Sequence, residues 1–169
     1  MNVATKSTDF VISRVFDAPR ELVWQAFTDP EHMKHWFGPK GSTVVVSKMD
    51  LRVGGTYHGA LRDPSGQVMW AKFIYREVAP PRRLVWEHSF SDENGGLTRH
   101  PLAPTWPLTL LTTVTFDEPR QGQTGVTLRW APLNATAEEQ ATFDAAHDSM
   151  RGGWGGSFDQ LAAFLAKAQ

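Results

Sequence analysis

Short apolar runs, rich in β-branched and aromatic residues, recur along the chain as far as residue 130, and clusters of Gly, Pro, Asp and Ser separate them. Such runs are typical of β-strands, and such clusters are typical of turns. The pattern predicts strands within residues 10–16, 44–46, 54–62, 67–78, 84–90, 108–116 and 124–130. Because turns join most of these runs, we expect an antiparallel meander rather than parallel crossovers.

Two short helices are predicted between the first and second strands. Asp17 is followed by Pro19, and Asp29 is followed by Pro30. Each pair combines a helix-capping residue with a proline in the first turn, where the missing N–H group costs nothing. Apolar residues at helical spacing follow each pair, and a Gly-Pro dipeptide ends the second segment.

The C-terminal part is predicted to be one long helix. Thr136 and Glu139 have the spacing of a capping box, and apolar residues from Phe143 to Leu165 recur every three or four positions. About 30 residues at 1.5 Å each would give a helix of roughly 45 Å. Glycines occupy positions 152, 153, 155 and 156 in its middle. We expect a kink there; the alternative is a place where the helix backbone must leave space.

These elements predict an α+β fold of the helix-grip type. A curved antiparallel sheet of six to seven strands would wrap around the long C-terminal helix, because an antiparallel sheet with one buried face needs a large element to cover it. The two short helices between strands 1 and 2 would close one end. We expect residues 1–169 to form a single domain, with room for a cavity between the middle of the sheet and the helix.

Composition narrows the classes of partner. The 169 residues include 17 Lys and Arg against 18 Asp and Glu, which gives a formal net charge of −1 and predicts no nucleic-acid partner. No run approaches the ~20 apolar residues of a membrane helix, and the first ten residues lack the apolar core of a signal peptide. We therefore expect a cytoplasmic protein with no membrane insertion. The absence of cysteine excludes disulfides, zinc–thiolate sites and thiol nucleophiles.

A series of short motifs, in order along nearly the whole chain, carries a family resemblance. The motifs are Ala18-Pro19, Val23-Trp24, Thr28-Asp29-Pro30, Trp36, Gly54-Gly55, Gly66, Tyr75-Arg76-Glu77-Val78, Pro80-Pro81, Arg83-Leu84-Val85, Val114-Thr115-Phe116, Gly153-Trp154 and Leu161. In these motifs the chain resembles the SRPBCC superfamily (START-like, birch-pollen-allergen-like). Within it, the chain is most similar to bacterial proteins that resemble the C-terminal domain of the activator of heat-shock protein 90 ATPase. The resemblance implies the helix-grip fold, but the superfamily includes lipid carriers, cyclases and hydratases, so it does not decide the function.

Aromatic and methionine side chains on the inward faces are the candidate ligand-binding residues. They are Tyr57, Met69, Phe73, Tyr75, Trp86, Phe90, Trp106, Phe143, His147 and Met150. Glycines at positions 59, 152 and 153 remove side-chain volume in the same region. We therefore predict a cavity that binds a small, mostly apolar molecule. The long segment 91–107, which carries Trp106, is the expected lid.

The sequence contains no catalytic, metal or cofactor motif that we recognise. His32 and His35 have a spacing compatible with metal ligation, but no third ligand accompanies them, so we expect no metal and no cofactor. An enzyme of the cyclase or hydratase kind, which the resemblance permits, remains an alternative. It would need His88, His147 or Tyr75 in the cavity with a perturbed proton affinity.

Two kinds of protein partner are also considered, a chaperone and a second copy of this chain. The resemblance allows a chaperone partner, but the known activators carry an additional N-terminal domain, whereas the first strand here begins within ten residues. A homodimer is also possible, because Trp70 and Ile74 are expected to be exposed on the outer face of the sheet.

Overall fold

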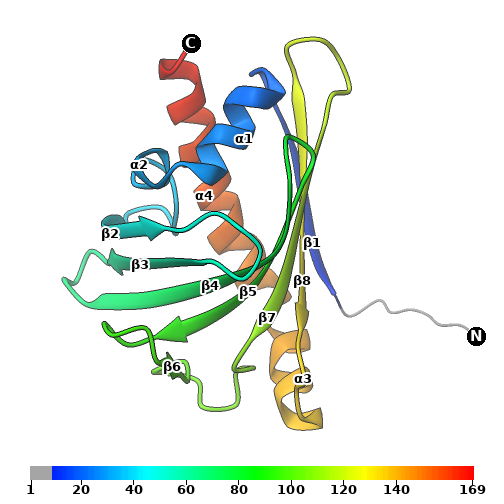
Figure 1. Ribbon diagram of the computed structural model, residues 1–169. Coiled ribbons are helices and arrows are strands. Elements are labelled where there is room, and N and C mark those ends of the chain that lie inside the picture. The colour runs from blue at the N-terminus through cyan, green and yellow to red at the C-terminus, as the bar shows by residue number, and fades with distance from the viewer. Residues whose placement is uncertain (1–8) are drawn as a thin grey trace, which may run out of the picture.

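The computed structural model describes residues 9–169, and its centre is one antiparallel sheet with the strand order β1-β8-β7-β5-β4-β3-β2 (Figure 1). A short strand, β6, pairs with the end of β5 outside this order. The strands are β1 (Phe10–Phe16), β2 (Thr43–Met49), β3 (Thr56–Arg62), β4 (Val68–Ala79), β5 (Arg83–Ser91), β6 (Leu97–Thr98), β7 (Leu110–Asp117) and β8 (Thr124–Pro132). All seven predicted strands are present, and β6 is an eighth, which lies inside the segment that the sequence predicted to be a loop.

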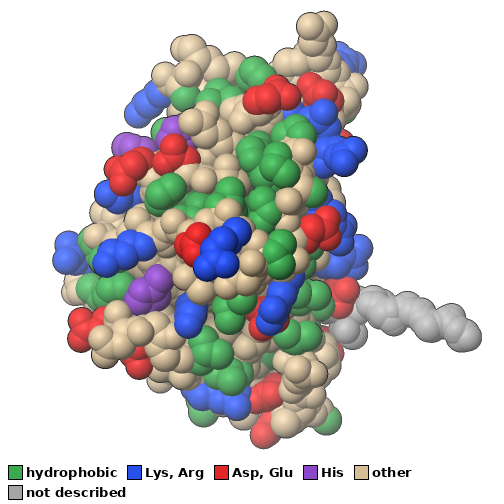
Figure 2. Space-filling view, in the orientation of Figure 1, with side chains coloured by type: hydrophobic (Ala, Val, Ile, Leu, Met, Phe, Trp, Pro, Cys, Tyr) green, Lys and Arg blue, Asp and Glu red, His purple; other side chains and the backbone are tan. Residues whose placement is uncertain are grey.

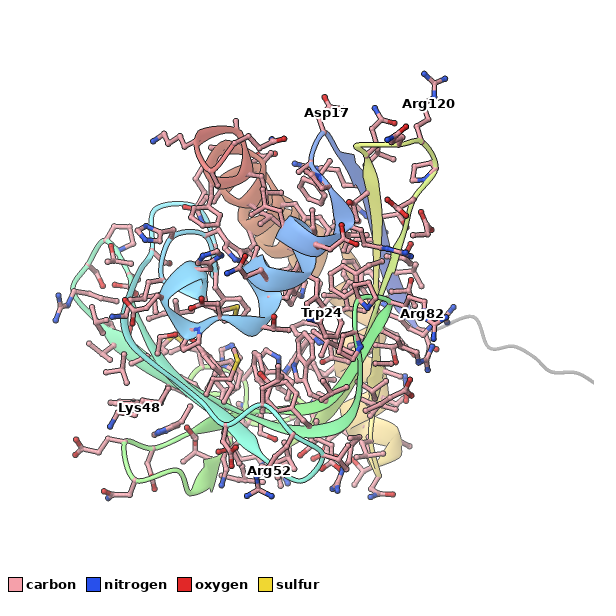
Figure 3. The ribbon with its side chains drawn as sticks, turned by 45° about the horizontal axis from the view of Figure 1, so that its top comes forward. Asp17, Trp24, Lys48, Arg52, Arg82 and Arg120 are labelled. Carbon is pink, nitrogen blue, oxygen red and sulfur yellow. The ribbon has the colours of Figure 1, made fainter. Side chains whose placement is uncertain are left out.

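The two predicted short helices are α1 (Arg20–Thr28) and α2 (Pro30–Met33). The Asp29 side chain caps α2 by accepting a hydrogen bond from the Glu31 N–H at 2.8 Å. On α1, Trp24 packs edge-on against Phe116 of β7, with 5.3 Å between the ring centroids (Figure 3). The helices therefore close one end of the sheet, as predicted.

The C-terminal segment forms two helices, α3 (Ala137–Ala145) and α4 (His147–Lys167), rather than one helix with a kink at the glycines. The interruption lies at Ala146, whose φ of −103° and ψ of 10° are not helical. Helix α4 continues through all four glycines. Each glycine lowers helix propensity by about 1 kcal/mol, but burial of one apolar face of α4 offsets this loss. The capping box at Thr136 and Glu139 is present at the start of α3.

Helix α4 lies across the concave face of the sheet, with α1 near its C-terminal end and α3 at its other end (Figure 1). Its buried side chains are Met150, Trp154, Ser157, Phe158, Leu161 and Leu165. Phe158 meets Phe16 of β1 edge to face at 5.7 Å, so that the helix is fixed against the β1–β8 side of the sheet. This arrangement confirms the predicted α+β helix-grip fold.

The outer surface mixes charges of both signs, and Figure 2 shows them interspersed over the face in view. Lys48 and Arg52 project outward from β2 and the turn that follows it (Figure 3). No helix in residues 9–169 has the length and hydropathy that a membrane crossing requires.

Candidate functional site

A cavity of about 460 Å³ lies between the middle of α4 and strands β3, β4, β5 and β8, and the segment that follows α2 and the turn between β3 and β4 form its remaining sides. Side chains from all these elements contribute apolar surface, among them Phe37, Leu61, Met69, Phe90, Trp130 and Trp154. The volume falls within the range of about 300–1,000 Å³ that small-molecule sites occupy. Sheet and helix therefore stand apart here.

Glycine at position 153 helps to keep this space open. Gly153 of α4 lines the cavity, and a Cβ atom at this position would have no atom within 4 Å. On the opposite wall, Ala71 of β4 contributes only a methyl group. Both positions are thus small where a filled core would have larger side chains.

An aromatic wall runs along one side of the cavity. Its members are His88, Trp130, Trp154 and Phe37, and successive rings meet edge to face. The ring centroids are 5.3 Å apart for His88 and Trp130, 5.6 Å for Trp130 and Trp154, and 6.0 Å for Trp154 and Phe37. This geometry is favourable between aromatic rings, so the wall holds its own shape.

His88 is the polar group that this wall contributes to the cavity. The Trp86 Nε1–H group donates to His88 Nδ1 at 3.4 Å. An indole nitrogen can only donate, so Nδ1 is the accepting nitrogen and the proton lies on Nε2. Burial lowers the pKa of His88 to about 3, and the ring is therefore neutral at pH 7. Within residues 9–169, Nε2 makes no hydrogen bond, and neighbouring atoms do not bury it completely. Because His88 lines the cavity, the accessible side of Nε2 faces the cavity.

Three other polar side chains around the cavity already have partners in the protein. Trp130 Nε1 donates to Thr112 Oγ1 at 2.7 Å, and Ser157 Oγ donates to the Gly38 carbonyl oxygen at 2.7 Å. The Lys40 ammonium group lies 3.1 Å from a carboxylate oxygen of Asp159. The interior is thus predominantly apolar, with its charged groups at the rim.

The segment between α2 and β2 is held against α4 at the cavity mouth. Besides Ser157, the Gln160 side-chain amide donates to the carbonyl oxygens of Gly38 and Trp36, both at 2.9 Å. A Cβ atom at Gly156 would lie 3.1 Å from the Lys40 backbone nitrogen. Gly156 is therefore not a kink but a place where the helix backbone leaves space, because the absence of a side chain lets the helix and the mouth segment approach closely.

An ion-pair cluster reinforces this contact from outside. Asp159 of α4 binds Arg14 of β1 at 2.7 Å and Lys40 of the mouth segment at 3.1 Å. Hydrogen bonds from Arg14, and then from Lys40, hold the pKa of the Asp159 carboxyl group below its ordinary value. All three side chains are at least one-third exposed, so that solvent weakens the pairing.

Three of the ten predicted ligand-binding residues, Met69, Phe90 and Met150, line the cavity. Four others, Tyr57, Phe73, Tyr75 and Trp86, lie in the packed core beside it. Phe73 stacks on Trp86 at 4.7 Å, and the Tyr57 hydroxyl shares a hydrogen bond with Ser47 at 2.9 Å. Burial raises the pKa values of both tyrosines, which therefore stay protonated.

The remaining three predicted residues, Trp106, Phe143 and His147, gather at the α3 end and do not line the cavity. Phe143 lies between the other two, 5.8 Å from the Trp106 ring and 5.5 Å from the His147 ring. His147 also meets Phe10 at 5.9 Å. The interruption at Ala146 changes the helix path, and it separates this cluster from the cavity-lining part of α4.

Several lining residues were not among the ten predicted. Leu61 shares a strand face with Tyr57 and Gly59, and Trp130 shares one with Leu128, so strand alternation contained a signal for both. Phe37 carries no such signal, because its place depends on the path of the segment after α2. His88 was expected to be a core histidine, with a role as acid or base only in the enzyme alternative, and was not among the ten.

The segment 91–107 is not the lid that the sequence analysis predicted. None of its residues lines the cavity. Instead β6 pairs with β5, Thr105 Oγ1 lies 2.8 Å from Thr142 Oγ1 of α3, and Arg99 forms an ion pair with Glu139 of α3. These contacts fix the segment against α3, away from the cavity mouth.

Two further expectations concern surface residues. Trp70 and Ile74 are half-buried rather than exposed, and Trp70 stacks on His58 with a centroid distance of 4.7 Å. His32 and His35 both contact the Phe164 ring of α4, at 5.1 and 5.3 Å. Within residues 9–169, no cluster of three or more His, Asp or Glu side chains is placed to hold a metal ion.

Comparison with known proteins identifies the family. The sequence profile described as "Activator of Hsp90 ATPase homolog 1-like protein" matches residues 17–166. No curated protein sequence matches the chain.

Solved structures share the fold. A protein from Nitrosomonas europaea is similar with a TM-score of 0.75 and 24% identity, over 97% of this chain and 98% of that chain. A protein from Arthrobacter aurescens has a TM-score of 0.78 and 23% identity, over 96% and 90%. The AHSA1 protein from Silicibacter pomeroyi has a TM-score of 0.71 and 19% identity, over 95% and 99%. With a family profile that spans nearly its whole length and a helix-grip fold, this chain belongs to the family of Activator of Hsp90 ATPase homolog 1-like proteins, within the SRPBCC superfamily.

Proposed function

We propose that this protein binds one small, mostly apolar molecule in the cavity between the sheet and α4, without covalent chemistry. The observation that carries the proposal is the cavity itself, about 460 Å³ in volume and lined mainly by apolar side chains. Moving apolar ligand surface from water into such a site is favourable by roughly 25 cal/mol per Å². The rigid aromatic wall lowers the cost of ordering the site when a ligand enters.

The distribution of polar groups also supports binding rather than catalysis. His88 reaches the cavity, but the other two candidate acid–base residues, Tyr75 and His147, do not line it. A neutral imidazole with a pKa of about 3 is a weak general base at pH 7. The arrangement therefore favours a site that orients a ligand through a hydrogen bond from His88.

A titration with N-phenyl-1-naphthylamine tests the proposal, because this neutral probe fluoresces strongly only in apolar surroundings. We expect saturable binding of one probe per chain, with energy transfer from the tryptophans of the cavity wall, Trp130 and Trp154. Native mass spectrometry of the purified protein should show the same 1:1 stoichiometry. Probe fluorescence that rises without saturation, or binding that occurs only after acid unfolding, would refute the proposal.

A further inference from the structure

We propose that the cavity selects flat aromatic molecules that carry a carbonyl oxygen, and that His88 Nε2–H donates the hydrogen bond to this oxygen. This inference rests on the proposed function and names the chemical class of its ligand. Its starting observation is that a hydrogen-bond donor, His88 Nε2–H, lies at the end of an aromatic wall of the cavity.

The wall determines the shape of the ligand. The edge-to-face series from His88 through Trp130 and Trp154 to Phe37 presents ring surfaces along one side of the cavity. A flat aromatic ligand can add another offset or edge-to-face contact to such a series, which a flexible aliphatic chain cannot.

The identity of the polar group determines the functional group of the ligand. Because Trp86 occupies His88 Nδ1, the ring offers the cavity a donor and no acceptor. The hydroxyl of Ser157 and the indole N–H of Trp130 already donate to protein acceptors. A ligand without an oxygen acceptor would leave the Nε2–H group desolvated and unpaired, which is unfavourable.

The charge of the interior excludes an ionised head group at this position. His88 is neutral, and the nearest ammonium group among the lining residues, that of Lys40, is paired with Asp159 at the rim. A carboxylate beside His88 would lose its hydration without gaining a cation. A ketone, quinone or ester carbonyl satisfies the donor without bringing a charge into the cavity.

A matched pair of ligands tests the inference. 2-Acetylnaphthalene and 2-ethylnaphthalene share a ring system and differ in the carbonyl oxygen. We expect the wild-type protein to bind the ketone about fivefold more tightly, as one net hydrogen bond predicts. His88→Phe should bind both compounds equally. His88→Gln is the control, because its amide nitrogen can occupy the place of Nε2, and it should retain the preference for the ketone.

Infrared spectroscopy supplies a measurement on the wild-type protein, which protects the test if a variant fails to fold. A ketone labelled with ¹³C at its carbonyl should absorb at lower frequency in the protein than in hexane, because hydrogen bonding weakens the C=O bond. Equal affinity of both compounds for the wild type, or a carbonyl band at its hexane position, would overturn the inference and leave the proposed function intact. Failure of both compounds to bind would refute the proposed function together with it.

Discussion

Two adjacent glycines of α4 allow the cavity to be tested with a matched pair of variants. Gly152 is exposed, Gly153 lines the cavity, and a Cβ atom would meet no neighbour within 4 Å at either position. Alanine in a helix interior is more favourable than glycine by about 0.8–1 kcal/mol. We expect Gly152→Ala and Gly153→Ala each to raise the free energy of unfolding by about 1 kcal/mol, which corresponds to about 2–4 °C in Tm for a chain of this size.

A larger side chain should separate the two positions. The side chain in Gly153→Phe is about the size of benzene, which occupies a cavity of about 150 Å³, or about a third of the 460 Å³ here. We expect Gly153→Phe to weaken binding of N-phenyl-1-naphthylamine about tenfold or more, a change of about 1.4 kcal/mol in binding free energy. The fold should be retained, because the new ring enters open space.

Urea unfolding and probe titration on the same samples measure both effects. Gly152→Ala is the control, since it gains helix propensity outside the cavity and should leave probe affinity unchanged. If Gly153→Phe folds and binds the probe with wild-type affinity, the assignment of the cavity as the binding site is wrong. If neither alanine variant is stabilised, the explanation of the glycines as a loss of helix propensity is wrong.

Three further predictions concern the mouth and His88. Gly156→Ala should be less stabilising than the two alanine variants above, as measured by urea unfolding, because its Cβ atom would press on the Lys40 backbone nitrogen at 3.1 Å. Ser157→Ala should lower the free energy of unfolding by about 1 kcal/mol in the same assay, because it removes the 2.7 Å hydrogen bond to the Gly38 carbonyl; an unchanged value would contradict this role. His88 has a folded-state pKa of about 3, so as the pH falls from about 6.5 towards 3 the unfolded chain takes up a proton that the folded protein does not. Over that range the wild type should lose about 1.4 kcal/mol per pH unit more than His88→Phe does, and parallel stability curves would show that His88 is not buried in its neutral form.

Periodicity in the sequence was sufficient to predict the fold. Strand alternation, the proline-containing helix starts and the capping box at Thr136 are local signals, and each corresponds to an element of the structure. The predicted cap of the first helix is wrong, because α1 begins at Arg20, its N-cap position is Pro19, and no side chain caps it. The error in the C-terminal helix has a physical reason. Glycine lowers helix propensity without breaking a helix, whereas the real interruption at Ala146 has no marker in residue type.

The cavity was harder to predict because alternation reports which face a side chain occupies and not where it lies along a curved sheet. Tyr57 and Phe73 do face inward, as predicted, but they lie where the core is closely packed. Phe90 and Met150 lie where helix and sheet stand apart. The difference depends on the path of the segment around Phe37, which long-range contacts with α4 determine.

Two glycines of α4, one helical turn apart, have opposite effects: one allows a close contact with the mouth segment, and the other leaves open space in the cavity. Gly156 lets the Lys40 backbone approach, which fixes the mouth segment, whereas Gly153 leaves space that this segment helps to enclose. Three residues along a helix return to nearly the same face, so the two glycines point in similar directions and differ in what lies opposite. Filling Gly153 should therefore change only the volume of the cavity, whereas filling Gly156 should displace the segment that forms its mouth. Variants at these two positions therefore show whether ligand binding depends on the volume of the cavity or on the position of the segment at its entrance.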